Sequence, residues 1–109
     1  MTTRNGTDFR LTSRQFELIA KALADPRRMA LLETIAGERA TCPCARLTDM
    51  FPVSKATISH HIKELVRAGL VEAHREGQFL SCEVRRDVLE AYTAELLRRA
   101  GGKTKTSAA

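Results

Sequence analysis

Apolar residues recur every three or four positions through the first part of the chain, and this spacing predicts a succession of amphipathic helices. The first helix begins near Thr12, because Thr12 and Gln15 have the spacing of a capping box. Asp25 followed by Pro26 predicts the start of a second helix, with the aspartate as its N-cap. Gly37 is the residue expected to end that helix.

Two further helices are predicted on either side of a tight turn. A short third helix covers Leu47 to Phe51 and is closed by Pro52. Ser54 is the expected N-cap of a fourth helix, which ends at Gly69. Two short helices joined in this way are typical of a helix-turn-helix.

The hydrophobic period then changes from helical to alternating. Residues 70–75 and 79–84 are short β-compatible runs, and Glu76-Gly77 between them is a turn signal, so a hairpin is predicted. A last helix is expected over residues 86–100. The resulting fold is mainly α with a small β-hairpin wing, in the order α-α-α-α-β-β-α, which is the plan of a winged helix-turn-helix.

The fourth helix has a polar side that suits the major groove of DNA. Leu47, Ile58 and Ile62 are expected to pack the third helix on the fourth, which leaves the opposite side to solvent. No acidic residue occurs between Asp49 and Glu64, and a helix N-terminus itself attracts phosphate. The alternative is that these residues form an ordinary solvated surface that does not bind DNA. This alternative applies most strongly to Arg75 at the hairpin tip. The predicted DNA-contacting residues are Lys55, Ala56, Thr57, Ser59, His60, His61 and Lys63 of the helix, and Arg75 of the hairpin.

His61 lies between this polar side and the apolar stripe of the fourth helix. A packing or phosphate-contacting role is favoured for it over metal ligation.

Composition agrees with a nucleic-acid partner. The 109 residues suit one domain, and 18 basic against 13 acidic residues give a net charge of +5, which favours a polyanionic partner. The chain has no tryptophan and only 5% aromatic residues, which argues against a stacking platform for single strands. No apolar run is long enough for a membrane span or an export signal, so the expected location is the cytoplasm.

Four segments together resemble the ArsR family of winged-helix repressors: Ala22–Arg28, Val53–Leu65, Ala68–Val71 and Arg75–Gly77. The resemblance covers about residues 12–100. It implies a cytoplasmic homodimer that pairs through its first and last helices and binds double-stranded operator DNA. In many members of the family, the protein releases the DNA when a metal, a metalloid or an oxidant reaches a site in the dimer.

The chain also departs from the pattern of that family. The last helix has no histidine, so the site of the family's zinc sensors looks absent. Cys42-Pro43-Cys44 is similar to the Cys-x-Cys of the arsenic sensors, but it falls about one residue earlier, and the further cysteine of some of them is Leu47 here. The inducer therefore does not carry over.

A homodimer is expected because the apolar stripes of the first and last helices exceed what a small core needs. For two of the four residues concerned, Tyr92 and Leu96, a purely intramolecular role in the core is the alternative. The predicted interface residues are Phe16, Ile19, Tyr92 and Leu96.

Three cysteines, Cys42, Cys44 and Cys82, do not imply a closed disulfide framework. If a short strand contains Cys42 and Cys44, their side chains point the same way, and pairing with the strand of Cys82 could bring three sulfurs together. Such a set suits As(III) or part of a Zn(II) site. A dithiol switch and simple packing of small apolar thiols are the alternatives.

The leading hypothesis is a sequence-specific transcriptional regulator, a repressor released from its operator by a metal, a metalloid or a thiol oxidant. The alternatives are a winged helix used only for protein contacts and a Cys-x-Cys redox protein. No nucleophile–base pair, phosphate loop or paired carboxylates can be assembled, so no enzyme is expected. The expected organisation is a flexible N-terminal arm (1–9), a winged-helix DNA-binding and dimerisation domain (10–100) and a disordered tail (101–109).

Overall fold

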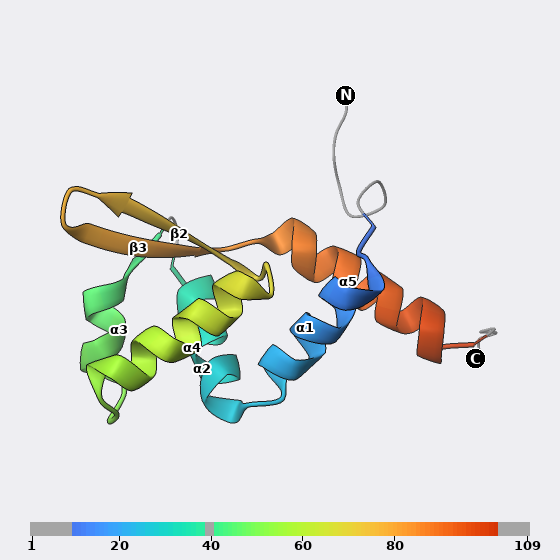
Figure 1. Ribbon diagram of the computed structural model, residues 1–109, viewed down its shortest axis with the longest axis horizontal. Helices are drawn as coiled ribbons and strands as arrows, with labels where there is room; N and C mark the ends of the chain where they lie inside the picture. The colour runs from blue at the N-terminus through green and yellow to red at the C-terminus, as the bar shows by residue number, and fades with distance from the viewer. Residues whose placement is uncertain (1–9, 39–40, 103–109) are drawn as a thin grey trace.

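Helices pack on one side of a small antiparallel sheet, whose hairpin extends beyond them, and the last helix leads away from the end of the sheet (Figure 1). The computed structural model describes residues 10–38 and 41–102, so the arm predicted over residues 1–9 and the tail from residue 103 lie outside the described residues. The elements are α1 (Ser13–Leu23), α2 (Pro26–Ala36), β1 (Cys42–Pro43), α3 (Cys44–Met50), α4 (Lys55–Arg67), β2 (Val71–Glu76), β3 (Phe79–Val84) and α5 (Arg86–Ala100).

The predicted winged helix-turn-helix is confirmed, with one correction to its order. The short strand β1 stands between α2 and α3, which the order α-α-α-α-β-β-α left out. Cys44 is the first residue of α3, so the strand expected to contain both Cys42 and Cys44 ends at Pro43. Side-chain alternation along a strand therefore does not relate these two cysteines.

Side-chain caps fix the starts of three helices where the sequence predicts them. Thr12 Oγ1 accepts a hydrogen bond from the Gln15 amide at 3.0 Å, and Asp25 Oδ1 accepts one from the Arg27 amide at 2.8 Å. Ser54 Oγ accepts one from the Thr57 amide at 3.1 Å. Each cap satisfies an amide that has no partner within its helix, and the last of them fixes where α4 begins.

Strand β3 is the centre of the sheet, with the order β1-β3-β2. Cys82 of β3 is opposite Cys42 of β1 and opposite Ala73 of β2. The hairpin turns at Gly77 and Gln78, and Gly77 has a φ of +63°, a conformation that glycine adopts without steric cost. The sheet thus brings residues from distant parts of the sequence around Cys82.

The core packs α3 on the inner side of α4. Leu47 of α3 is fully buried, together with Ile58 and Ile62 of α4. This packing fixes the rotation of α4 and leaves its other side to solvent. The largest fully buried side chains are Ile19, Leu31, Leu47, Ile58, Leu65, Leu70, Val88, Cys42 and Cys82.

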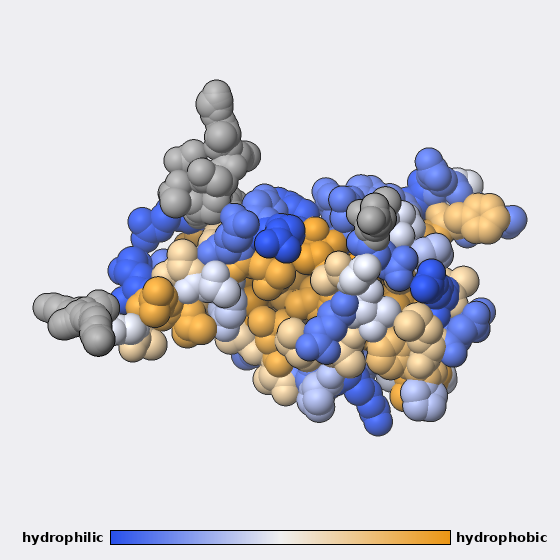
Figure 2. Space-filling model, turned by 180° about the vertical axis from the view of Figure 1, so that it is seen from behind, coloured by the Kyte–Doolittle hydropathy of each residue, from blue (hydrophilic) through white to orange (hydrophobic). Residues whose placement is uncertain are grey.

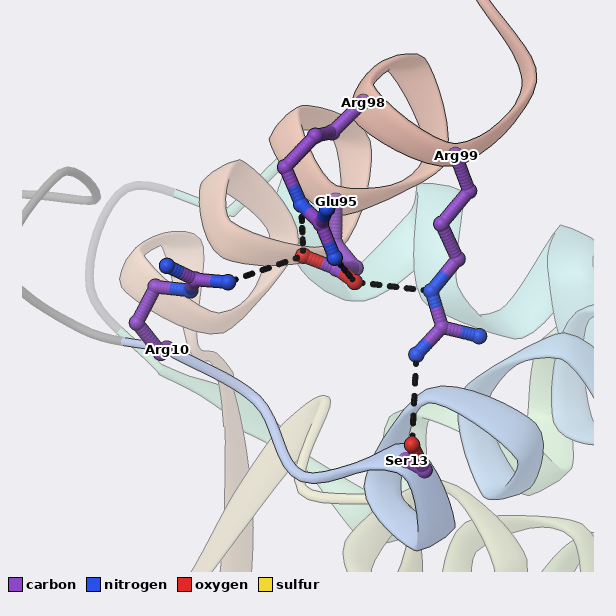
Figure 3. Close-up of polar contacts among 5 residues, drawn as sticks. All are labelled: Arg10, Ser13, Glu95, Arg98 and Arg99. Carbon is purple, nitrogen blue, oxygen red and sulfur yellow. Dashed lines mark hydrogen bonds and ion pairs between the residues drawn. The ribbon is translucent and has the colours of Figure 1, made fainter.

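A charged cluster around Glu95 of α5 reaches α1 through Arg99, whose guanidinium lies 3.4 Å from Ser13 Oγ (Figure 3). The buried Glu95 carboxylate accepts hydrogen bonds from Arg98 at 2.6 Å and from Arg99 at 2.7 Å. The guanidinium of Arg99 also lies 4.1 Å from the centre of the Phe16 ring, and that ring packs against Tyr92 with the two ring planes tilted by 35°. These contacts set the angle at which α5 leaves the domain.

Within the described residues, no helix combines the length and apolar character needed to cross a lipid bilayer.

Candidate nucleic-acid interface

The outer side of α4 is exposed and free of carboxylates except at its end. The only acidic residue of this helix is Glu64, in its last turn. Neither Lys55 nor Lys63 forms an ion pair within the described part of the chain, so both ammonium groups are free to contact phosphate. The residues of this helix that were predicted to contact DNA and that are exposed in the structure are Lys55, Ala56, Ser59, His60 and Lys63.

Thr57 is placed in the cap rather than on the open face. Its hydroxyl lies 2.9 Å from that of Ser54, and its amide donates to the same Ser54 oxygen. The side chain is half-buried. Thr57 therefore holds the first turn of α4 in place beside the residues that face solvent.

His61, which the sequence places between the polar side and the apolar stripe of this helix, faces inward in the structure. Its side chain is 6% exposed, and Nδ1 lies 3.4 Å from Nη1 of Arg28 in α2. Within the described residues its Nε2 atom has no hydrogen-bond partner. Burial is the main cause that lowers the pKa of His61 below 6.5; Arg28 also lowers it, whereas Asp25 raises it. His61 thus packs α4 against α2, which is the packing role that the sequence left open for it beside a phosphate contact.

The hairpin tip carries an apolar residue that sequence reasoning missed. Arg75 is exposed near the end of β2, as predicted. Phe79, the first residue of β3, is 73% exposed. The available signal was the position of this phenylalanine directly after a predicted turn. Phe79 pairs with Glu76 at the tip of the hairpin, and no strand residues lie beyond this pair to cover its ring.

Two of the three cysteines come together. Sγ of Cys44 lies 3.2 Å from Sγ of Cys82. The Cys42 thiol is instead directed at the carbonyl of Pro43, 3.8 Å away. Only one set of three possible metal ligands in the described residues lies within 4.8 Å, and it contains no cysteine. The predicted three-sulfur site is therefore not assembled, whereas a dithiol pair is.

The two paired thiols differ in acidity and in access. The contact with the Cys82 thiol lowers the pKa of Cys44 to about 7, because it stabilises the Cys44 thiolate. The same contact, together with burial, raises the pKa of Cys82. Cys44 is half-buried, whereas Cys82 is fully buried. Cys44 is thus the more nucleophilic and the more accessible partner.

The one ligand-like set is on the outer face of the hairpin. Nε2 of His74 lies 3.3 Å from a carboxylate oxygen of Glu83 and 3.7 Å from one of Glu72. All three side chains are exposed. Glu72 and Glu83 are directly opposite in the sheet, and the His74 ring contacts the carboxylates of both. Exposed side chains that meet in this way on a hairpin do not by themselves indicate a metal site.

The four predicted interface residues do not share one environment. Ile19 is fully buried within its own chain and therefore has no exposed side-chain surface, so a position near the interface, rather than within it, is what stays predicted for this residue. Phe16 and Tyr92 are half-buried, with ring centres 5.1 Å apart. Leu96 is 44% exposed, which excludes a purely internal role, and the neighbouring Leu97 is also exposed. Apolar residues gather in the middle of the face shown in Figure 2.

Comparison with known proteins agrees with this geometry. Residues 23–74 match a family described as a helix-turn-helix domain. The transcriptional repressor SdpR of Bacillus subtilis is 33% identical over 72 residues, which are 66% of this chain and 78% of SdpR. The arsenical resistance operon repressor of the same species is 34% identical over 64 residues, 59% of this chain and 60% of that protein.

Solved structures show the same fold. An ArsR-like transcriptional regulator from Rhodococcus sp. RHA1 superposes with a TM-score of 0.66 at 27% identity, covering 81% of this chain and 80% of that one. A homodimeric winged helix-turn-helix DNA-binding domain from Mycobacterium bovis gives 0.64 at 23% identity, covering 86% of each chain.

The fold and these relatives define a transcriptional regulator with a DNA-binding helix-turn-helix, not an enzyme. The chain belongs to the ArsR family.

Proposed function

We propose that this regulator is a homodimeric repressor that binds operator DNA through α4 and the hairpin, and that the Cys44–Cys82 pair controls its affinity. The observation that carries the proposal is the exposed, carboxylate-poor side of α4. A regulator of this kind meets its operator in the cytoplasm.

The chemistry of α4 assigns different tasks to its residues. Lys55 and Lys63 neutralise phosphates on either side of the groove, and the N-terminus of α4 adds its own partial positive charge. Ser59 and His60 supply hydrogen-bond donors and acceptors for base edges. Arg75 reaches the phosphates or the minor groove beside the hairpin.

A homodimer doubles the surface that reads DNA. The exposed Leu96 and Leu97 of α5 offer an apolar surface for a second copy. The Mycobacterium bovis neighbour with this fold is described as homodimeric. A two-fold dimer would place two α4 helices on half-sites about one helical turn apart.

The thiol pair is coupled to α4 through α3. Cys44 begins α3, and Leu47 one turn later packs against α4 in the core. A disulfide between Cys44 and Cys82 requires an S–S distance of about 2 Å instead of the observed 3.2 Å, and we propose that α3 and β3 shift relative to one another when it forms. This movement would shift α4 within the dimer.

A metal or metalloid ion fits this pair less completely than a disulfide. Cys44 and Cys82 could supply two thiolates to As(III) or Zn(II), but the described residues place no third cysteine ligand with this pair. The arsenical resistance operon repressor of Bacillus subtilis supports testing arsenite. We therefore propose oxidation as the signal, with metalloid binding as the competing outcome.

Footprinting and sedimentation test the proposal together. The reduced protein should protect two half-sites in the DNA upstream of its own gene and sediment as a dimer. Ser59→Ala and His60→Ala should each cost about 1–3 kcal/mol on that DNA. Diamide should weaken binding of the wild type and of Cys42→Ser, but not of Cys44→Ser. A reduced protein that binds no DNA, or a Cys44→Ser variant as sensitive to diamide as the wild type, would contradict it.

A further inference from the structure

A cavity of about 810 Å³ opens between α4, the hairpin and the start of α3. One wall is α4 and the other is the hairpin, and most of the surface that lines the cavity is apolar, although half of the lining residues are polar or charged. Its volume is that of a small-molecule site rather than of a single water or ion. The apolar side chains that define the two walls are Ile58, Ile62 and Val66 on α4, and Ala73, Phe79 and Leu80 on the hairpin.

The charged residues that line the same groove are mostly cationic. Lys55, Lys63 and Arg67 line it along α4, and none of the three forms an ion pair with another described residue. Among the described residues, Glu76 is the only one with a carboxylate that lines this groove. A molecule with an apolar chain and an anionic head is complementary to this combination.

The groove also contains a nucleophile. Cys44 lines it, whereas Cys82 lies behind Cys44, fully buried and 3.2 Å away from sulfur to sulfur. Cys42 is buried and does not line the groove. A molecule in the groove therefore meets Cys44 first, and the second thiol is within reach of whatever forms on the first.

We propose that this groove binds long-chain organic hydroperoxides with an anionic head, such as fatty-acid hydroperoxides, and that Cys44 reduces them. The inference rests on the proposed function, because it names the oxidant that acts on the Cys44–Cys82 pair. The inference adds a binding site for that oxidant, which is the groove between α4 and the hairpin.

The reaction needs no group that the chain or the hydroperoxide lacks. The Cys44 thiolate attacks the terminal peroxide oxygen, the O–O bond breaks, and the alkoxide takes up a proton to leave as the alcohol. Cys44 is then a sulfenic acid. The Cys82 thiol attacks its sulfur, an S–S bond forms, and the hydroxyl group leaves as water after taking the proton of Cys82. Two thiols are oxidised and one hydroperoxide is reduced.

The position of the groove links binding directly to DNA release. Lys55, Ser59 and Lys63 line the groove and also belong to the exposed side of α4. An acyl chain in the groove would cover part of the surface that we assign to DNA, so the hydroperoxide competes with DNA even before it reacts.

The test compares oxidation rates of the reduced full-length protein with different peroxides. Free thiols are counted against time with linoleic acid hydroperoxide, tert-butyl hydroperoxide and hydrogen peroxide. Loss of two thiols per chain should be on the order of tenfold or more faster with the linoleic acid hydroperoxide, because its chain adds buried apolar area. Cys42→Ser should react as the wild type does, and Cys44→Ser should lose the fast phase.

Val66→Glu and Met29→Glu form a matched pair of variants. Val66 lines the groove and is 39% exposed, whereas Met29 on α2 does not line it and is 37% exposed. Val66→Glu should remove the preference for the long chain, and Met29→Glu should react with all three peroxides as the wild type does. Equal rates with all three peroxides, or a preference that survives in Val66→Glu, would overturn the inference.

DNA binding by the reduced protein separates this inference from the proposed function. If the reduced wild type binds DNA and diamide releases it, but the three peroxides react at equal rates, the groove proposal alone fails. If the reduced protein does not bind DNA, the proposed function fails, whatever the rates are.

Discussion

Nη1 of Arg28 lies 3.4 Å from Nδ1 of His61, and this contact joins α2 to the middle of α4. The same guanidinium donates to the carbonyl of Ala22 at 2.9 Å, so it also holds the end of α1. A neutral imidazole can accept at Nδ1, whereas a protonated one cannot. The position of the DNA-contacting helix therefore depends on a histidine that must stay uncharged.

His61→Leu should make the stability of the protein less dependent on pH. The folded chain binds the His61 proton at a lower pH than the unfolded chain does, because burial lowers the pKa of His61. Wild-type stability should therefore fall as the pH drops from the ordinary value of 6.5 toward the lowered pKa. Thermal unfolding across this window should show a smaller decline for His61→Leu, and identical pH profiles would refute the role of His61.

Glu95→Gln should remove a second, more acidic source of pH dependence. Hydrogen bonds from Arg98 and Arg99 lower the pKa of Glu95 from 4.5 to about 2. The stability that Glu95 contributes is complete above pH 4.5 and is lost as the pH falls toward about 2. Melting curves should show Glu95→Gln less stable than the wild type at neutral pH and closer to it in acid. A constant difference between the two would contradict this.

Ser54→Ala should destabilise the protein by about 1 kcal/mol, because the amide of Thr57 loses the oxygen that caps α4. Denaturant unfolding measures the change. Thr93→Ala is the control: it removes a helical hydroxyl that bonds only to a carbonyl one turn earlier, and it should change stability by less than about 0.5 kcal/mol. Equal effects of the two substitutions would show that the cap is unimportant.

Leu47→Ala should cost about 2–5 kcal/mol, since it leaves a cavity between α3 and α4. At temperatures where the variant is still folded, its affinity for DNA should also fall, because α3 sets the rotation of α4. Met29→Ala, on a partly exposed methionine of α2, should have a much smaller effect on both properties. A stability loss without any change in DNA affinity would separate α3 packing from DNA binding.

Local signals made the helices predictable. Thr12, Asp25 and Ser54 each cap the helix they were expected to cap, because a cap depends only on residues two or three positions away. The predicted order of elements did not include strand β1, because its two residues, Cys42 and Pro43, are too few to form an alternating pattern. Strand β1 forms by pairing with the edge of β3, which is distant in the sequence, so no local pattern indicates it.

The directions of single side chains were harder to predict. His61 is buried because of how α4 is rotated against α2, and Ile19 is buried because its own chain covers it. Glu95 is a charged residue inside the structure, which no hydrophobic pattern indicates; its burial depends on the arginines around it. The convergence of Cys44 with Cys82, without Cys42, follows from the chain turning into α3 after Pro43.

The salt dependence of DNA binding tests the central claim most directly. Fluorescence anisotropy would measure the affinity of the reduced wild type, Lys63→Ala and Arg14→Ala for the same duplex at several salt concentrations. Arg14 is an exposed residue in the first turn of α1, outside the assigned DNA face. If the outer side of α4 contacts phosphate, the slope of log K against log salt becomes shallower by about one for Lys63→Ala and stays at the wild-type value for Arg14→Ala. Identical slopes for all three proteins would contradict the assignment of this side of α4 to DNA.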